Sequence, residues 1–168
     1  YSESSGSTQI KGLISSESLI FTGGSLEILE TATLSGPISL AGGRLIGGTI
    51  TTLNSIETNS NGNNTLQGVT LNGVINLTES SDRLRVYNSL TLNGTADLSG
   101  SSSILEFDGG TQTLGADAGQ STTVDLGTTT STMRVLGGAQ LTLEDTVTVE
   151  GRGMLRGYGS GNTITSDG

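Results

Sequence analysis

Acidic side chains are the main candidates for chemistry in this chain, because it contains no His, Cys or Trp. Disulfides, thiolate chemistry, zinc sites of the usual kind and His-dependent catalytic triads are therefore excluded. Glu144 and Asp145 form an adjacent acidic pair, which an exposed strand end explains better than acid–base catalysis. The aspartates are scattered among predicted turns, at Asp82, Asp97, Asp108, Asp117, Asp125, Asp145 and Asp167.

Two further motifs could bind ligands but have simpler structural interpretations. Arg83 and Arg85 flank Leu84, so on a strand they would point outward, where we expect them to pair with acidic neighbours. The glycine-rich run 151–157 is one residue off the G-x-G-x-x-G spacing of a phosphate-binding loop, and no helix is predicted after it. A turn between strands explains this run better.

Metal and carbohydrate chemistry also lack a clear sequence signature. Neither an EF-hand loop nor the glycine-rich calcium nonapeptide occurs, so only adventitious calcium on acidic loops is expected. Polysaccharide-cleaving enzymes need clustered carboxylates, usually with Arg or His nearby, and the sequence shows no such cluster. We therefore predict a protein that is not an enzyme, with no catalytic, cofactor-binding or metal-binding residues.

Threonine rows on a flat β-surface can match the lattice of ice, so the Thr-x-Thr pairs are candidates for an ice-binding surface. The pairs are unevenly spaced along the sequence and do not predict one common ladder, and Thr is a favoured outward residue of strands. We therefore interpret the pairs as ordinary strand surface. They begin at Thr49, Thr111, Thr146 and Thr163.

The size and charge of the chain limit its partners. Its 168 residues suit one domain covering 1–168, with a flexible stretch at 1–9. The net charge of −9 argues against nucleic acids and anionic membranes as partners, and no apolar run reaches the roughly 18 residues of a membrane span. Because Tyr1 is neither an initiator Met nor part of an apolar signal segment, we expect a processed product or a segment of a longer rod.

Short strands with a recurring glycine turn dominate the sequence. The pattern apolar-x-apolar-x-Gly-Gly begins at Leu19, Ile38, Leu105 and Met133, with a degenerate copy at Leu84. The first two copies are one repeat apart, as are Leu84 and Leu105, and the residues 69–73 recur one repeat later as 90–94. The longer interval from Ile38 to Leu84 requires two coils, and the interval from Leu105 to Met133 requires one enlarged coil. These intervals indicate about eight units of roughly 19–23 residues.

A unit of about 20 residues cannot bury its own apolar face, but stacked units can. The sequence therefore predicts an all-β solenoid, specifically a right-handed parallel β-helix of about eight coils with Phe21 and Phe107 in its core. An antiparallel β-sandwich is the competing fold, but it requires neither a fixed period nor a recurring Gly-Gly. Asn72 and Asn93 should stack at a corner. Polar insertions should leave the rod together at one corner, at 59–64, 79–82, 99–103 and 116–123.

The runs 89–95 and 137–143 resemble secreted bacterial β-helix proteins, namely filamentous-haemagglutinin-like adhesins and autotransporter passenger domains. The resemblance covers nearly the whole chain, but it consists of the general pattern of short strands and glycine turns in the repeats. It implies a right-handed parallel β-helix, export from the cell, and a role in adhesion or in a surface fibre. It implies no catalytic residues.

These observations predict a structural, non-enzymatic rod segment of an extracellular or cell-surface bacterial fibre or adhesin. A second hypothesis is a filament subunit that stacks end to end, because uncapped coils expose strand edges. A third is a carbohydrate-binding or carbohydrate-cleaving β-helix, although three Tyr and two Phe provide few stacking platforms. The expected partners are copies of the chain, flanking solenoid segments and surface glycans, with neither nucleic acid nor membrane insertion.

Overall fold

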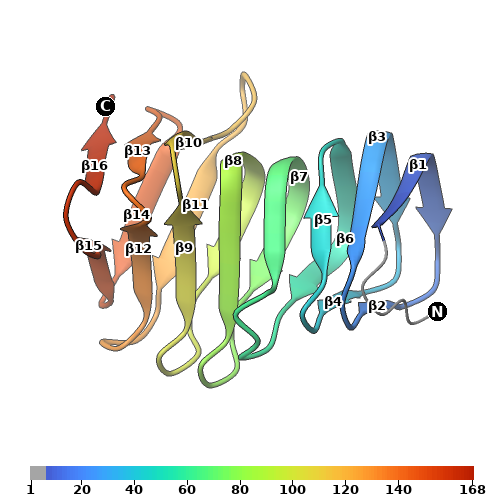
Figure 1. The fold of residues 1–168 in the computed structure, drawn as a ribbon, viewed down its shortest axis with the longest axis horizontal. Helices are drawn as coiled ribbons and strands as arrows, with labels where there is room; N and C mark the ends of the chain where they lie inside the picture. The colour runs from blue at the N-terminus through green and yellow to red at the C-terminus, as the bar shows by residue number, and fades with distance from the viewer. Residues whose placement is uncertain (1–6) are drawn as a thin grey trace.

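The computed structural model describes residues 7–168, which form a rod of stacked β-coils with the first and last strands at opposite ends of the rod (Figure 1). Sixteen strands join one sheet that winds through about eight turns, and every pairing is parallel. The prediction of an all-β solenoid is confirmed. The strands are β1 (Ser7–Ser15), β2 (Leu19–Phe21), β3 (Ser25–Leu34), β4 (Ile38–Leu40), β5 (Arg44–Ile46), β6 (Thr49–Glu57), β7 (Thr65–Asn76), β8 (Arg83–Asp97), β9 (Ile104–Asp108), β10 (Thr111–Gly115), β11 (Thr122–Leu126), β12 (Thr132–Leu136), β13 (Gln140–Leu143), β14 (Val147–Gly151), β15 (Met154–Gly157) and β16 (Thr163–Ser166).

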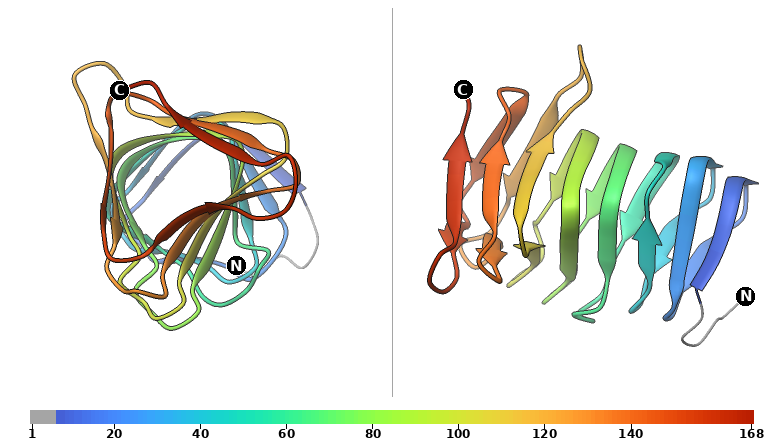
Figure 2. Two further views of the ribbon diagram at one scale, coloured as in Figure 1. Left: turned by 90° about the vertical axis from the view of Figure 1, so that its left-hand side faces the viewer. Right: turned by 45° about the horizontal axis from the view of Figure 1, so that its top comes forward.

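The strand pairings divide the rod into three lengthwise faces, and the view along the rod shows the coils stacked in projection (Figure 2). Face A consists of β5, β9, β12, β15 and the first parts of β1, β3, β7 and β8. Face B consists of β10, β13, β16, the first part of β6 and the middle or later parts of β1, β3, β7 and β8. Face C consists of β2, β4, β11, β14 and the last parts of β6, β7 and β8.

Apolar ladders fill the interior, because the inward residue of each coil stacks on the equivalent residue of the next. On face A one ladder runs through Leu26, Leu45, Leu66, Val86, Phe107 and Val135. On face C another runs through Ile38, Ile56, Ile75, Ala96 and Val124. Most of these side chains are inaccessible to solvent. Each large one contributes roughly 1.5–3 kcal/mol by leaving water, so the ladders are the main source of stability.

All but one of the predicted intervals between coils are confirmed by the strand register. The exception is the two-coil interval from Ile38 to Leu84, because Ile38 pairs with Ile56 on face C whereas Leu84 pairs with Leu105 on face A. Leu19 pairs with Ile38, and Val69 pairs with Leu90, so both predicted repeats correspond to neighbouring coils. The enlarged coil is also present, because Leu105 pairs directly with Met133 on the next coil.

The copies of the recurring glycine pattern lie on two different faces of the coil. The copies at Leu19 and Ile38 lie on face C, whereas those at Leu105 and Met133 lie on face A. Leu84 pairs with Leu105, so it too belongs to face A. The pattern describes a strand followed by a tight corner, and this three-sided coil has more than one such corner.

The loops correct the expectation of a single loop corner. Those around 59–64, 79–82 and 99–103 stack on one another, with Arg83 N donating to Asn59 O and Ser81 N donating to Ser101 O. The segment 116–121 instead leaves at the corner between faces B and C, where Asp117 N donates to Asn93 Oδ1. The loops therefore project from two corners.

Asn64 is also an exception to its predicted place in a polar loop, because it is fully buried. Its amide nitrogen donates to the backbone oxygens of Asn59 and Arg83, and its side-chain oxygen accepts from Gly42 N. The side chain thus replaces an apolar core residue and ties three consecutive coils together.

The predicted asparagine stack is confirmed at the corner between faces B and C. Asn93 Nδ2 donates to Asn72 Oδ1 over 2.6 Å. Gly73 and Gly94 follow with φ values of 153° and 152°, which side chains rarely adopt. A Cβ at Gly94 would collide with the Gly73 carbonyl oxygen. Glycine is therefore required there for the coils to approach closely.

The stretch predicted to be flexible, 1–9, lies partly outside the described residues. Its final part, 7–9, begins β1 and pairs with β3. Phe107 is fully buried, as predicted, whereas Phe21 is only partly buried against the core because it lies in the first described coil.

Candidate functional site: the arginine face

The outward side of face A collects most of the positive charge of an acidic chain. Side chains that point outward from successive coils stack at about 4.8 Å. One such column contains four arginines, and Arg83 lies beside it on β8. Five of the six arginines in the sequence are thus on this face. The column runs through Ser25, Arg44, Thr65, Arg85, Glu106, Arg134 and Arg156.

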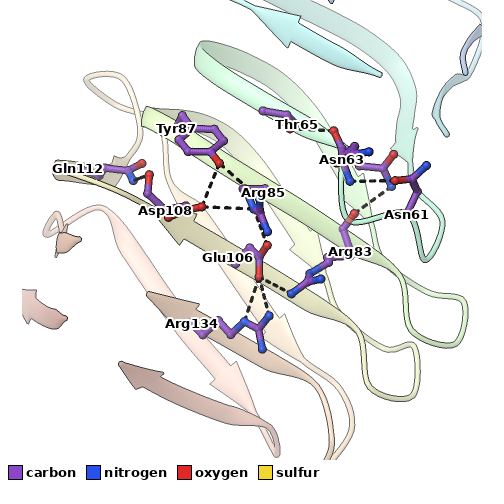
Figure 3. A network of polar contacts seen from close by, with 11 residues as sticks. Asn61, Asn63, Thr65, Arg83, Arg85, Tyr87, Glu106, Asp108, Gln112 and Arg134 are labelled. Atoms are coloured by element: carbon purple, nitrogen blue, oxygen red, sulfur yellow. Dashed lines mark hydrogen bonds and ion pairs between the residues drawn. The ribbon is translucent and has the colours of Figure 1, made fainter. Parts of the chain in front are cut away.

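Glu106 organises the middle of the column, and its side chain is completely buried (Figure 3). Arg85 Nε donates to Glu106 Oε1 over 2.7 Å. Arg83 Nη2 and Arg134 Nη2 both donate to Oε2, over 3.0 and 2.7 Å, and Arg134 Nε donates to it as well. We call Glu106 with these three arginines the clamp. It offsets the repulsion that stacked arginines would otherwise experience.

Burial alone would raise the pKa of Glu106, because it disfavours the charged form. Hydrogen bonds from Arg134 and Arg85, together with the charges of Arg83 and Arg85, outweigh burial and hold the pKa below its ordinary value of 4.5. Glu106 is therefore ionised at neutral pH and surrounded by donors. This arrangement suits a structural anion rather than a general acid, which needs a raised pKa.

Both tyrosines of the described chain also lie on this face. Tyr87 donates its hydroxyl to Asp108 Oδ2 over 3.0 Å, and Asp108 lies 3.6 Å from Arg85 Nε. The Tyr158 ring lies 5.2 Å from the guanidinium of Arg134 and 5.7 Å from that of Arg156, close enough for cation–π attraction. Aromatic rings therefore accompany the arginines along the face.

A polar hollow of about 360 Å³ lies on the N-terminal side of the clamp. Its wall contains Ser25, Arg44, Asn63, Thr65, Arg85 and Tyr87, and none of the lining residues between positions 7 and 168 is a carboxylate. Arg44 is exposed, and within residues 7–168 its side chain makes no ion pair or hydrogen bond. We call this feature the hollow. It offers hydroxyl groups, amides and one unpaired guanidinium.

Comparisons with protein-family models, curated proteins and solved structures found no match to this chain. The site is therefore interpreted from its own geometry. In the described part of the chain, no helix is long and apolar enough to cross a membrane. Nor do three or more His, Cys, Asp or Glu residues gather there in a way that could hold a metal ion.

The outcome for the residues singled out in the sequence is mixed. Arg83 and Arg85 do pair with an acidic neighbour, as predicted. Glu144 and Asp145 lie in the turn between β13 and β14, and the run 151–157 comprises the last residue of β14, a short turn and β15. The sequence interpretation missed Arg44 and the role of Glu106. The pairing of Leu105 with Met133 was a usable signal, since it also makes Glu106 and Arg134 neighbours.

A threonine ladder on face B was also missed. The Thr-x-Thr pairs that begin at Thr49 and Thr111 do lie in different columns. However, Thr49 belongs to a four-coil column whose members are not all in Thr-x-Thr pairs. This column consists of Thr31, Thr49, Thr70 and Thr91 and ends at Gly115. Comparing only Thr-x-Thr motifs could not find it.

Proposed function

We propose that this chain is a structural, non-enzymatic rod segment of an extracellular or cell-surface bacterial fibre or adhesin. The continuous apolar ladders carry this proposal, because they run through consecutive coils despite loops and one enlarged coil. Force along such a rod is shared by many parallel backbone hydrogen bonds and by the packed interior. The rod therefore acts as a stiff spacer whose corner loops are available for contact.

The chemistry of the buried carboxylates supports a structural role. Glu106 is held ionised by three arginines, and Asp82, the other buried carboxylate among the described residues, accepts a hydrogen bond from Glu79 N. Neither arrangement resembles two opposed carboxylates around a scissile bond. The extracellular location rests on the resemblance of the repeats to secreted adhesins.

End-to-end assembly is a second candidate function, and the exposed apolar ends of the rod favour it. At one end, Ile10, Leu19 and Phe21 help to line a separate apolar pocket of about 280 Å³. At the other end, Met154 and Leu155 are 40% and 44% exposed. Stacking another coil on either end would extend the ladders and pair the strand edges.

Labelling of intact cells tests the location and role. An antibody raised against the folded chain should label the surface of unbroken source cells, in patches or along fibres. The matched control is an antibody against a cytoplasmic protein, which should label only permeabilised cells. Labelling of this chain only after permeabilisation would overturn the proposal.

Negative-stain electron microscopy of the purified chain, at dilute and high concentration, separates the two candidates. Single rods roughly 40 Å long at every concentration support the spacer role. Long uniform fibres that increase with concentration support the filament subunit. Compact particles without a long axis would contradict both.

A further inference from the structure

The hollow combines groups that recognise a sugar with groups that recognise an anion. Arg44 and Arg85 belong to one column and are two coils apart, so their Cα atoms are separated by about 10 Å. Thr65 lies between them in the register. We propose that the hollow binds a carboxylate-bearing sugar unit of an acidic polysaccharide, with the carboxylate between the two guanidinium groups.

The two arginines are suited to different parts of this task. Arg44 has no partner among the described residues, so its planar guanidinium can give two parallel hydrogen bonds to a carboxylate. Arg85 is fixed by its hydrogen bond to Glu106 and reaches the hydroxyl of Tyr87. It therefore presents its charge in a fixed position and loses little freedom when a ligand binds.

The remainder of the wall suits a carbohydrate. Tyr87 provides an aromatic ring that is held in place through its hydroxyl bond to Asp108. Asn63, Thr65 and Ser25 supply amide and hydroxyl groups that can exchange hydrogen bonds with sugar hydroxyls. Figure 3 shows Asn63 and Thr65 near Arg85 and Tyr87 on neighbouring coils. The volume of about 360 Å³ is within the roughly 300–1,000 Å³ of small-ligand sites.

The overall charge of the chain indicates which acidic polymers fit. A net charge of −9 repels densely charged polyanions at long range, including nucleic acids and heavily sulfated glycans. A polysaccharide with isolated carboxylates, spaced by neutral sugars, meets less of this repulsion. One carboxylate then interacts with the local positive charge of the hollow.

The test is calorimetric titration of the whole chain with a panel of oligosaccharides. The panel contains hyaluronan and sialylated oligosaccharides, whose carboxylates are spaced by neutral sugars, polygalacturonate and alginate, which carry a carboxylate on every unit, and heparin as the sulfated polyanion. At least one carboxylate sugar should bind more tightly than heparin. Reducing its carboxylates to alcohols should weaken binding roughly ten-fold or more, the usual scale for losing a charged hydrogen-bonded pair.

Matched variants locate the site. Arg44→Gln should weaken binding roughly ten-fold, and Arg44→Lys less, because Lys retains the charge without the planar fork. Arg152→Gln makes the same charge change in the turn before β15 and should alter binding less than about two-fold.

Three results would overturn the proposal. These are no binding by any carboxylate sugar of the panel, equal loss in the Arg44→Gln and Arg152→Gln variants, or undiminished binding after carboxylate reduction. The last result is read on the unaltered chain, so it decides the matter even if a variant folds poorly.

Discussion

The clamp and the hollow are two regions of one arginine column, and they use the same residue type in opposite ways. In the clamp, Glu106 lies between Arg85 and Arg134 in the register and forms ion pairs with both. In the hollow, the residue between Arg44 and Arg85 is Thr65, which carries no charge. The neighbour on the adjacent coil therefore decides whether an arginine stabilises the fold or remains available to a ligand.

Arg85 belongs to both regions and links them. Its Nε donates to Glu106, while the same side chain lines the hollow. Burial lowers the pKa of Arg85, but hydrogen bonds with Glu106 and Tyr87 outweigh this and raise it above its ordinary value. The clamp thus fixes the position of a partly buried guanidinium, which is charged throughout the working pH range, at the edge of the hollow.

The largest expected effect is on folding stability when the clamp loses its anion. Glu106→Gln removes the carboxylate that pairs with all three arginines, which leaves Arg83 and Arg134 without an ion pair and Arg85 with Asp108 alone. Breaking a fully buried ion pair costs about 3–5 kcal/mol, and we expect about 2–4 here because the arginines are partly exposed. Arg44→Gln should change the free energy of unfolding by less than about 0.5 kcal/mol. Urea unfolding followed by circular dichroism measures both.

Glu17→Gln is the control for this comparison, because Glu17 is exposed in the turn between β1 and β2. Its stability should remain within about 0.5 kcal/mol of the original chain. If Arg44→Gln were as destabilising as Glu106→Gln, the hollow would be part of the structural network and the distinction between the two regions would fail.

The sequence predicted the coils better than the faces. Apolar alternation and recurring glycine pairs are local signals, so they indicated the strands, the repeat length and the enlarged coil between Leu105 and Met133. Which face a strand occupies depends on how many corners precede it in its coil. The Gly-Gly corner occurs after face A and after face C, so the pattern could not distinguish Ile38 from Leu84.

This limitation also explains why the site was found only in part. Arg83 and Arg85 lie on either side of Leu84 on one strand, so their outward direction and acidic pairing could be predicted. To predict that Arg44 shares a column with Arg85, one must first align β5 correctly with β7 and β8. The predicted two-coil interval from Ile38 to Leu84 puts these residues on one face, and it therefore assigns the wrong neighbours to the segment that contains Arg44.

Acid should weaken the clamp and leave the contribution of Arg44 unchanged. Because the pKa of Glu106 is lowered in the folded chain, its stabilising effect is complete above its ordinary pKa of 4.5. The effect is lost as the pH falls below that value and through the lower pKa of the folded state. The stability difference between the original chain and Glu106→Gln should therefore shrink as the pH falls from 7 toward 3. Urea unfolding at several pH values measures it.

Asp82 changes the free energy of unfolding in the opposite direction as the pH falls. The effect of Glu106 must therefore be measured as the difference between the original chain and Glu106→Gln. Burial raises the pKa of Asp82 above its ordinary value of 3.8, so protonation favours the folded state as the pH falls. Asp82 is present in both proteins, and its effect cancels in the difference. A difference that stays constant from pH 7 to 3 would show that the clamp does not depend on an ionised Glu106.

The smallest expected effect concerns the boundary between the two regions. Tyr87→Phe removes the hydroxyl that donates to Asp108, and the loss of one such bond costs about 0.5–1.5 kcal/mol. A double-mutant cycle with Asp108→Asn should show coupling, because the two side chains are in contact. The same cycle with Arg44→Gln should show coupling below about 0.5 kcal/mol, since no hydrogen bond joins Tyr87 to Arg44. Equal coupling in both cycles would mean that Tyr87 joins the clamp and the hollow into one network, and that Arg44 is positioned by the fold rather than left available to a ligand.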